Sequence, residues 1–499
     1  MYFSKSKYTR LRSCPKVLWL DENRPDLRPD DENTRARFEA GNEVGALARG
    51  LFGPYVDVTA LKENGDLDLA RMIENTKREM EAGTPVICEA SFSWQGLYCA
   101  VDLLRKEGDG WAVYEVKSST DPVQEKYFHD TGYQKYVLEL CGVPLTGVYL
   151  VCLNNKYVFD GNLNLQELFR IYDMQEAATA ERINIPDALA LAERTLASDT
   201  EPETELGALC PDCDYWPWCS RNLPKPNVFD LYRLNKDKKA EYYQKGLITF
   251  EALRDSGLIK NAAQRRQIEY ATEEKGTWIE KEKIRAFLNT LTFPLYFLDF
   301  ESMQPAVPLY VGTRPYAQIP FQYSLHYVEQ EGGELRHREF LAESGTDPRR
   351  AIAEALCRDI PEDACVTAYN KAFECTRLKE LAAMFPDLSE HLTRIAEHVI
   401  DLITPFQSGY YYNRAMGGSF SIKSVLPAIY PDDPDLDYHN LAGVHNGGEA
   451  MSVFPKMQFM DPEEREVTRR NLLKYCELDT YALVKVWEEL RRAAQMNEG

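Results

Sequence analysis

The sequence predicts an α/β protein with more than one domain. Residues 85–154 contain four short apolar runs of strand length and one helical stretch, and residues 296–327 contain two further runs. Helical patterns follow both regions, and strands that alternate with helices are typical of α/β folds. A chain of 499 residues also has room for roughly two to four domains. We expect domains at residues 1–222, 223–290 and 291–499.

Charge and composition limit the class of protein. Hydrophobic residues make up 44% of the chain and charged residues 27%, which is usual for a globular protein. The formal net charge of −21 indicates that any basic surface for nucleic acid is local. The first twenty residues lack the apolar core of a signal peptide, and no apolar run is long enough to span a membrane. We therefore expect a cytoplasmic protein without a membrane partner, whose 12 cysteines are core thiols or metal ligands.

The first domain contains a candidate hydrolytic site. Its predicted elements are helices 36–52 and 68–82 and strands 85–93, 97–104 and 111–118. Glu115 and Lys117 share one strand face, and Asp102 lies near the end of the strand before. Two acids can hold a divalent ion while a lysine orients a water against phosphate. The alternative, a cross-strand ion pair on a sheet surface, is disfavoured by the apolar residues around Glu115.

A helix over 126–140 and a strand over 147–154 complete this pattern. With Asp102, the Glu115-Val116-Lys117 triplet and Gln134 on the helix, the region resembles PD-(D/E)XK nucleases of the RecB and CRISPR-adaptation class. The resemblance implies a restriction-endonuclease-like fold. It also implies that Asp102 and Glu115 bind metal and that Lys117 and Gln134 join them in catalysis.

Two positions depart from that family's pattern. A metal-binding histidine of the first helix is replaced by Gly45, and Tyr136 follows Gln134 by two residues where the family has four. Glu43 or Glu89 is a candidate for the missing ligand. Whether the first site is active is therefore open at this point.

Three cysteines lie close together after an acidic connector that ends the mostly helical stretch 162–208. Cys210, Cys213 and Cys219 form a C-x2-C-x5-C pattern, and three thiols so close in sequence indicate a soft metal or a cluster. Cys14 is the candidate for a fourth ligand. Four thiolates suit both structural zinc and a 4Fe-4S cluster. The nuclease class named above has one cysteine before its core and three after it, and the resemblance implies the 4Fe-4S cluster.

Residues 223–290 are predicted to be helical. They resemble the small helical linkers that join nuclease modules, and a packing spacer is an equal alternative.

The last domain is organised around the stretch YFLDFES at 296–302. This stretch predicts a buried strand in which Asp299 and Glu301 share a face. Two buried carboxylates so close together need a cation, and oxygen ligands favour Mg²⁺ or Mn²⁺. The alternative is one outward acid and one hydrogen-bonded acid at the end of the strand. Residues 319–327 are expected to form the neighbouring strand.

Further acids follow in the same domain. Glu374 comes after a short apolar strand, and Asp401 ends another apolar run. Tyr475 and Asp479 are four apart on a predicted helix, so they share one helix face. The acids can thus converge in the order Asp-x-Glu, Glu374, Asp479.

Residues 290–495 resemble the DEDD exonucleases of the ribonuclease H-like superfamily. Asp299 and Glu301 match the first motif, Glu374 the second and Asp479 the third, while Tyr475 stands where the tyrosine subtype orients the attacking water. The resemblance implies a metal-dependent 3'-5' exonuclease. The second acid is usually Asp, so the longer Glu374 leaves open whether Asp401 shares the metal.

Three other residues of this domain are candidates for the site. Lys423, near the start of a predicted helix at 418–429, is a candidate for phosphate binding or a simple exposed lysine. His439 and His445 are candidates for a base in place of Tyr475, or structural histidines.

The whole chain resembles an uncharacterised bacterial family that shares YFLDFE, YN-x2-FE and YC-x2-DT. The resemblance implies a two-domain nuclease acting on DNA or RNA, with single strands favoured. The alternatives are a nucleic-acid-binding or scaffold protein with a degenerate first nuclease domain, and a zinc-stapled regulatory protein without catalysis.

Overall fold

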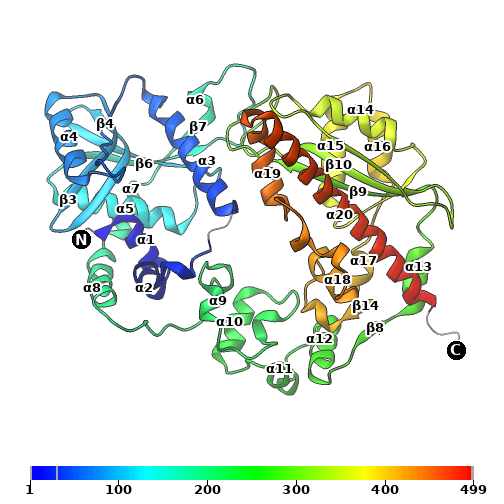
Figure 1. Ribbon diagram of the computed structural model, residues 1–499. Helices are drawn as coiled ribbons and strands as arrows, with labels where there is room; N and C mark the ends of the chain where they lie inside the picture. The colour runs from blue at the N-terminus through cyan, green and yellow to red at the C-terminus, as the bar shows by residue number, and fades with distance from the viewer. Residues whose placement is uncertain (1–2, 30–31, 496–499) are drawn as a thin grey trace. The chain divides into compact units, whose positions relative to one another are not determined.

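The computed structural model describes residues 3–29 and 32–495 and has a mixed α/β structure (Figure 1). The chain forms two compact units. Unit 1 holds Met1–Glu205 and Pro305–Ala317, and unit 2 holds Leu206–Gln304 and Gln318–Gly499. The α/β prediction is confirmed at this level. The division differs from the expected one, because residues 206–290 belong to unit 2 and a segment between two strands of unit 2 belongs to unit 1.

Unit 1 is built on a seven-stranded sheet in the order β2-β3-β4-β5-β6-β7, with β1 beside β4. The neighbouring strands β3, β4 and β5 are antiparallel, as expected of a meander, and β6 returns parallel to β5 after helix α5 (Glu125–Leu140). The strands are β1 (Phe3–Ser4), β2 (Val56–Asp57), β3 (Val86–Trp94), β4 (Leu97–Glu107), β5 (Gly110–Lys117), β6 (Leu145–Leu153) and β7 (Phe169–Asp173). Strand β7 lies in the stretch that the sequence predicts as mostly helical.

Helices cover both faces of this sheet. On one face, Tyr8 of α1 and Tyr133 of α5 are fully buried against the sheet, and their rings stack with centroids 5.0 Å apart. On the other face Val44 of α3 packs against Tyr114 of β5. The helices are α1 (Lys5–Ser13), α2 (Pro15–Asn23), α3 (Glu32–Ala48), α4 (Leu69–Ala82), α6 (Leu165–Leu168), α7 (Gln175–Glu181) and α8 (Ile185–Leu196), with short 3-10 turns at η1 (Pro25–Leu27) and η2 (Arg49–Phe52).

Helix α4 shows how local sequence sets an element of unit 1. The Asp68 carboxylate accepts a hydrogen bond from the Arg71 N–H at the start of the helix. Gly83 ends it with φ of 75°, a left-handed conformation that glycine adopts without strain. The predicted end of this helix, at Gly83-Thr84-Pro85, therefore agrees with the structure.

Unit 2 contains a five-stranded sheet in the order β11-β10-β9-β12-β13. Strand β10 is antiparallel to both of its neighbours, β9 and β11, while β12 pairs parallel with β9 and with β13. Strand β9 is thus central, and each of its side chains meets one of the two layers of helices. The strands are β9 (Leu295–Met303), β10 (Ile319–Val328), β11 (Arg336–Leu341), β12 (Cys365–Ala368) and β13 (Val399–Asp401).

The two faces of β9 meet different helices. Tyr296, Leu298 and Phe300 pack into a core with α14 (Arg349–Asp359), α15 (Ala372–Met384) and α16 (Ser389–Glu397). Phe297 points the other way and packs against Trp487 of the long helix α20 (Pro462–Gln495), with ring centroids 5.6 Å apart. The expected alternation along this strand is therefore present. The remaining elements after β13 are α17 (Thr404–Gln407), β14 (Tyr411–Asn413), η5 (Arg414–Met416), α18 (Ile422–Ile429), η6 (Pro434–Leu436), η7 (Tyr438–Asn440), α19 (Gly447–Lys456) and η8 (Met457–Phe459).

The segment before β9 has a small core of its own, to which Phe229, Phe250, Leu253 and Ile268 contribute. Strand β8 pairs with β14, so this segment is joined by hydrogen bonds to the C-terminal part of unit 2. Its elements are η3 (Cys210–Asp212), α9 (Trp216–Cys219), η4 (Val228–Asp230), α10 (Lys236–Gln244), α11 (Phe250–Ser256), α12 (Ala262–Thr272), β8 (Thr277–Ile279) and α13 (Lys281–Leu288). None of the helices within residues 3–29 and 32–495 is both long and apolar enough to cross a membrane.

Candidate metal centres

The acidic group of unit 2 lies on the central strand of its sheet. Strand β9 turns Asp299 and Glu301 toward α20, on the face opposite Phe300. Helix α20 carries Asp479 to the same place. Carboxylate oxygens of Asp299, Glu301 and Asp479 lie within 4.8 Å of one another. Residues that are almost 180 positions apart in sequence thus form one group, as the motif order predicts.

The electrostatics of this group favour a bound cation. Burial raises the pKa of Asp299 well above its usual range, and repulsion from Asp479 and Glu301 adds to the effect. Burial and the Asp479 charge also raise the pKa of Glu301. Burial raises the pKa of Asp479 to about 6, although hydrogen bonding from Tyr438 and the charge of Lys423 act in the opposite direction. A divalent cation would relieve the repulsion and restore the charged forms.

Glu374 adds a fourth buried carboxyl near the group. It lies in the first turn of α15, is 4% exposed, and its Oε2 atom has no hydrogen-bond partner among the described residues. Burial raises its pKa to about 8, and the charge of Asp401 adds to this effect. Glu374 also contributes to the raised pKa of Asp299. Buried polar atoms usually have a hydrogen-bond partner, so this carboxylate oxygen is suited to bind a hard cation.

Asp401 does not join this group, because backbone groups occupy its carboxylate. Its Oδ1 accepts hydrogen bonds from the N–H groups of Asn370 at 2.9 Å and Ile403 at 3.2 Å. Its Oδ2 accepts from the Lys371 N–H at 3.0 Å. Asn370 has φ of 67°, a left-handed conformation that these bonds stabilise. Asp401 therefore holds the turn that leads into the helix of Glu374.

Two tyrosines lie beside Asp479. Tyr475 is 3% exposed, and burial together with the Asp479 charge raises its pKa. Tyr438 donates a hydrogen bond of 2.6 Å to Asp479 Oδ1. The sequence pattern indicates Tyr475 through its spacing from Asp479, whereas nothing in the pattern indicates Tyr438, which comes from the short turn η7.

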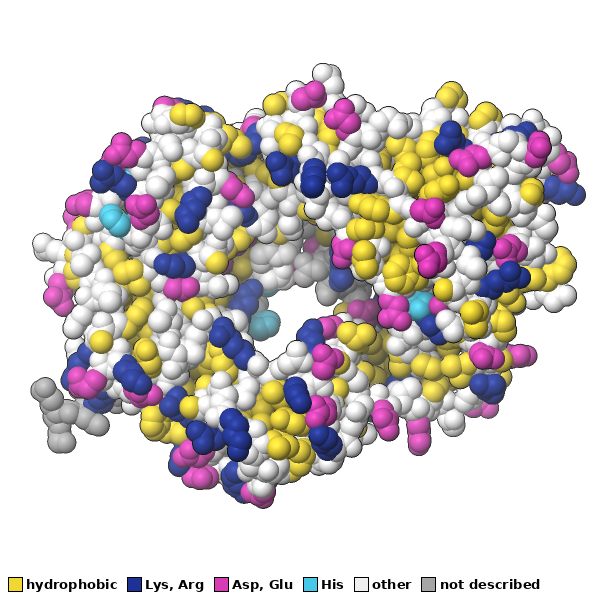
Figure 2. All heavy atoms as spheres, turned by 180° about the vertical axis from the view of Figure 1, so that it is seen from behind, with side chains coloured by type: hydrophobic (Ala, Val, Ile, Leu, Met, Phe, Trp, Pro, Cys, Tyr) yellow, Lys and Arg dark blue, Asp and Glu magenta, His cyan; other side chains and the backbone are white. Residues whose placement is uncertain are grey.

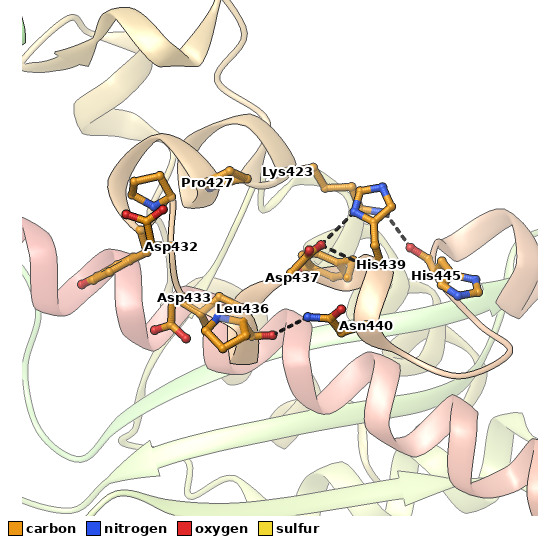
Figure 3. Close-up of a pocket in the computed structure, with 13 residues that line it drawn as sticks. Lys423, Pro427, Asp432, Asp433, Leu436, Asp437, His439, Asn440 and His445 are labelled. Atoms are coloured by element: carbon orange, nitrogen blue, oxygen red, sulfur yellow. Dashed lines mark hydrogen bonds and ion pairs between the residues drawn. The ribbon is translucent and has the colours of Figure 1, made fainter.

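A cavity of about 520 Å³ lies beside these tyrosines (Figure 3). Lys423 lines it, with its ammonium 5.1 Å from the centre of the Tyr438 ring and 5.7 Å from that of Tyr475. The charge of Lys423 acts to lower the pKa of Asp299, Glu301 and Asp479. His439 and His445 also line the cavity, where they pair with Asp437 at 2.8 Å and Glu449 at 3.0 Å.

The start of α19 comes close to Glu301. Asn446 caps the helix by accepting a hydrogen bond from the Glu449 N–H at 3.1 Å. The first helical residue is Gly447, and a Cβ atom there would stand 3.4 Å from Glu301 Oε2. The helix start therefore lies in van der Waals range of the carboxylate.

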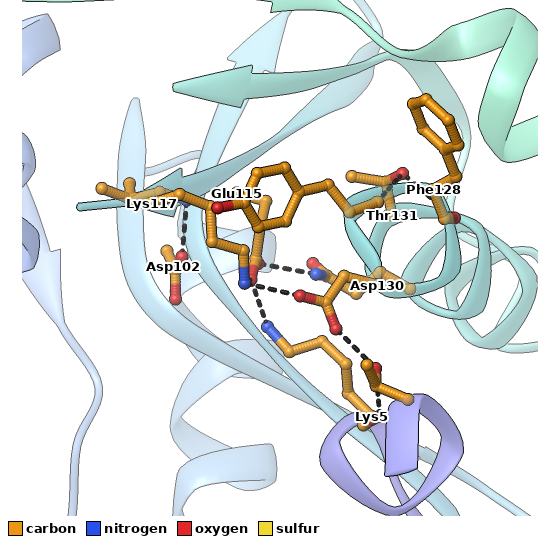
Figure 4. Close-up of polar contacts among 11 residues, drawn as sticks. Lys5, Asp102, Glu115, Lys117, Phe128, Asp130 and Thr131 are labelled. Atoms are coloured by element: carbon orange, nitrogen blue, oxygen red, sulfur yellow. Dashed lines mark hydrogen bonds and ion pairs between the residues drawn. The ribbon is translucent and has the colours of Figure 1, made fainter. Parts of the chain in front are cut away.

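The predicted site of unit 1 also assembles in the structure (Figure 4). Glu115 is 1% exposed, and its Oε2 accepts a hydrogen bond of 2.6 Å from Gln134 Nε2. Its Oε1 accepts from Lys117 Nζ at 2.7 Å and from Lys5 Nζ at 2.6 Å. Asp102 Oδ2 accepts from the Val116 N–H at 2.6 Å. All four predicted residues are therefore together, within the sheet interior and not on an open sheet surface.

Lys5 and Asp130 are further members of this cluster that the sequence pattern does not indicate. Lys117 Nζ lies 2.5 Å from Asp130 Oδ2, which comes from α5. Lys5 comes from α1, 110 positions before Glu115. No local spacing links such residues.

The neighbouring charges and burial shift the pKa values of Glu115 and Asp102 in opposite directions. Burial acts to raise the pKa of Glu115, but the ammonium groups of Lys117 and Lys5 outweigh it and hold that pKa below its usual range. Burial and the Glu115 charge raise the pKa of Asp102 to about 7. Near neutral pH, Glu115 is therefore a full anion while Asp102 exchanges a proton readily.

The candidates for a replacement ligand differ in their surroundings. A Cβ atom at Gly45 would have no heavy atom within 4 Å, so the place of the family's histidine is open. Glu89 has φ of 56° and lies 3.4 Å from Arg49, and burial raises its pKa. Burial also raises the pKa of Glu43 on α3.

The cysteine triplet lies at the start of unit 2. Cys210 begins η3, Cys213 caps it and Cys219 ends α9, and all three cysteines are half-buried. The Cys210 sulfur accepts a hydrogen bond of 3.2 Å from the Gly207 N–H. Cys14 is a free, half-buried thiol between α1 and α2 in unit 1.

Surface charge is mixed on the face of the molecule seen in Figure 2. Lysine and arginine side chains are interspersed with acidic ones there. This agrees with a net charge of −21 and with basic groups that act locally.

Part of the sequence matches a family of unknown function, and part of it is similar to an uncharacterised protein. Residues 296–421 match a family model described as "Domain of unknown function (DUF2779)". The match contains Asp299, Glu301 and Glu374 and ends before Asp479. The "Uncharacterized protein MG366 homolog" of Mycoplasma pneumoniae (strain ATCC 29342 / M129 / Subtype 1) is 26% identical over 208 residues. That alignment covers 38% of this chain and 31% of the relative. No solved structure matches the chain.

Proposed function

We propose that the protein is a metal-dependent nuclease that hydrolyses phosphodiester bonds, with its main active site in unit 2. The observation that carries the proposal is the group of Asp299, Glu301 and Asp479, whose carboxylate oxygens lie within 4.8 Å of one another. Three buried carboxylates so close together repel one another, and they lower the stability of the folded chain when no cation is bound. Perturbed carboxyls beside a cavity are typical of active sites.

The sheet of unit 2 supports the finer form of this proposal. Its first three strands are antiparallel and its last two run parallel to the central strand, which carries the acids. This arrangement fits the ribonuclease H-like fold that the sequence resembles, with a DEDD exonuclease of 3'-5' polarity as the implied activity. The cavity lined by Tyr438, whose hydroxyl donates to Asp479, provides room for a nucleotide.

Each residue of the unit 2 site has a proposed role. Mg²⁺ or Mn²⁺ held by Asp299, Glu301, Glu374 and Asp479 would supply an activated water and stabilise the leaving oxygen. Tyr475 orients the attacking water, and Tyr438 fixes the Asp479 carboxylate through its hydrogen bond. Lys423 binds a substrate phosphate from the cavity side, as a point charge. The substrate is a single strand of DNA or RNA, because a flexible end can enter a cavity that a duplex cannot.

Unit 1 is proposed to be a second, PD-(D/E)XK-type site. Asp102 and Glu115 would hold the metal, while Lys117 and Gln134 orient water and Glu115. The specific observation that favours the alternative, a degenerate unit that only binds nucleic acid, is the ammonium of Lys5 at 2.6 Å from Glu115. Lys5 neutralises the carboxylate that the ion needs, so a divalent ion must displace it.

The cysteines are proposed to hold a 4Fe-4S cluster, with structural zinc as the alternative. Cys210, Cys213 and Cys219 would supply three of the thiolates. The closeness of the three cysteines in sequence supports this proposal.

The proposal is tested by following digestion of end-labelled single strands of DNA and RNA in Mg²⁺ or Mn²⁺. Asp299→Asn should slow stepwise removal of terminal nucleotides by at least about 100-fold, because one metal loses a ligand. Glu488→Gln, which changes an exposed carboxylate on the same helix as Asp479, is the matched control and should leave the rate unchanged. Lys117→Ala should remove a separate cleavage activity of unit 1. Digestion by Asp299→Asn at the parental rate and with the parental ladder would refute the assignment.

A further inference from the structure

Unit 2 contains a second group of candidate ligands that the proposed nuclease site does not use. It consists of His326 on β10, His337 on β11 and Glu477 on α20. A ring nitrogen of each histidine and a carboxylate oxygen of Glu477 lie within 4.8 Å of one another. We propose that these three side chains bind a divalent transition-metal ion of the zinc class.

The register of the sheet creates the histidine pair. His326 and His337 are directly opposite each other on the antiparallel strands β10 and β11, so both project to the same face. Their ring centroids are 4.5 Å apart. Helix α20 crosses that face, and Glu477 reaches the pair from it, with Oε1 3.9 Å from His337 Nδ1.

One assignment of protons satisfies all four hydrogen bonds of this group, and it leaves one nitrogen of each neutral ring free. The Thr480 hydroxyl lies 3.1 Å from the Glu477 carbonyl oxygen, which can only accept, so Thr480 donates its one proton there. Thr480 must then accept from both of its other partners, the Ser324 hydroxyl at 2.7 Å and His326 Nδ1 at 2.8 Å.

The same assignment continues to the second histidine. Because Ser324 gives its proton to Thr480, it accepts from His337 Nε2 at 2.9 Å. Both N–H groups thus point away from the proposed ion. The lone pairs of His326 Nε2 and His337 Nδ1 remain as ligands, which is how hydroxyls and carbonyls orient metal-binding histidines in proteins.

The chemistry of the donors selects the class of ion. Two imidazole nitrogens and one carboxylate suit Zn²⁺, Co²⁺ or Ni²⁺, whereas Mg²⁺ prefers oxygen alone. Burial and the neighbouring His337 lower the pKa of His326 to about 4, so its ring is neutral at physiological pH. The side chain of Glu477 is 49% exposed, so an ion can enter from solvent and keep a water as its fourth ligand.

The proposed ion would join three elements of unit 2. It would tie β11, the edge strand of the sheet, to β10 and to α20. Ser324 is paired with Asp299 in the register of β10 and β9, and Thr480 follows Asp479 directly, so the two centres share one sheet face and one helix. The argument does not depend on nuclease activity, because it uses only the second group of side chains.

The test is Co²⁺ binding to the full-length protein, followed by visible absorption in excess Mg²⁺ so that the carboxylates of the first centre are occupied. We expect His337→Gln and Glu477→Gln each to lose one Co²⁺ equivalent or at least about tenfold in affinity, without change in any thiolate-to-cobalt band. The matched control is His391→Gln, because His391 lies 3.9 Å from Glu362 but belongs to no group of three candidate ligands among the described residues.

A second kind of variant keeps all three ligands and tests the hydrogen bonds that orient them. Thr480→Val keeps all three ligands but removes the hydroxyl that fixes the His326 tautomer, and should weaken Co²⁺ binding by about 10- to 100-fold. Glu477→Gln changes a half-exposed side chain, so it tests the site even if a histidine variant fails to fold. Equal Co²⁺ uptake and affinity in the parent and Glu477→Gln would overturn the proposal.

Discussion

The buried carboxyl of Glu374 makes the stability of the metal-free protein depend on pH. Burial raises its pKa from 4.5 to about 8, because the charged form loses hydration that no hydrogen bond to Oε2 replaces. In the unfolded chain the same group titrates near its usual pKa. Glu374→Gln places a neutral group of similar shape at the site and removes this titration.

The sign and size of the effect follow from linkage. Below about pH 4.5 both states of the parent are protonated, and Glu374 has no pH-dependent effect on folding. As the pH rises through the window from 4.5 to about 8, the unfolded chain loses the proton while the folded protein keeps it, so stability falls. Between about pH 6 and pH 8 this amounts to about 2 kcal/mol, at 1.36 kcal/mol per pKa unit with partial ionisation at the upper end.

The measurement is urea unfolding of the full-length protein in a chelator at those two pH values. The parent should lose about 2 kcal/mol more stability than Glu374→Gln between them. Glu397→Gln, an exposed carboxylate on a neighbouring helix, is the control and should follow the parent. Added Mg²⁺ should stabilise the parent more than Glu374→Gln, because an ion favours the charged carboxylate. The reasoning is refuted if the parent and Glu374→Gln show the same pH dependence.

Three further changes test other parts of the molecule. Tyr438→Phe removes a hydrogen bond that acts to lower the pKa of Asp479, so the acidic limb of the nuclease pH profile should move to higher pH; an unmoved profile would contradict this. Lys5→Met should strengthen Mn²⁺ binding in unit 1 by about tenfold, since it frees Glu115, and a Mn²⁺ titration with unchanged affinity would count against that role. If the cluster is bound, anaerobically purified parent protein should be brown and contain iron, and Cys219→Ser should lose the colour and most of the iron; equal iron in both proteins would exclude the cluster.

The sequence predicts much of the secondary structure because hydrophobic periodicity is a local signal. The stretch around Asp299 alternates between two buried faces, and that alternation alone places Asp299 and Glu301 on one face, which α20 covers in the structure. Strand β7 was not predicted, because Phe169–Asp173 is short and lies between helical segments. Its pairing with β6 depends on hydrogen bonds across the sheet that no local pattern shows.

The members of a candidate site were predictable where they lie on the same face of one helix or strand. Tyr475 and Asp479 on one helix, and Glu115 and Lys117 on one strand, are of this kind. Lys5, Tyr438 and the histidine pair were not predictable, because each depends on contacts between elements far apart in sequence. The role of Asp401 as a backbone acceptor likewise depends on the left-handed turn at Asn370.

The segment between β9 and β10 determines how the protein responds to truncation or proteolysis near residue 205. Pro305–Ala317 leaves the sheet of unit 2 and belongs to unit 1, where Ala306 and Val307 are 3% and 6% exposed in the core beside Tyr114. A polypeptide that stops at residue 205 would therefore uncover part of that core. A single protease cut near residue 205 would instead leave Pro305–Ala317, still covalently part of the C-terminal fragment, packed in the core of unit 1, so non-covalent packing would hold the two fragments together. Gene truncation at this boundary should give an aggregating product, whereas a nicked full-length chain should stay together on a sizing column.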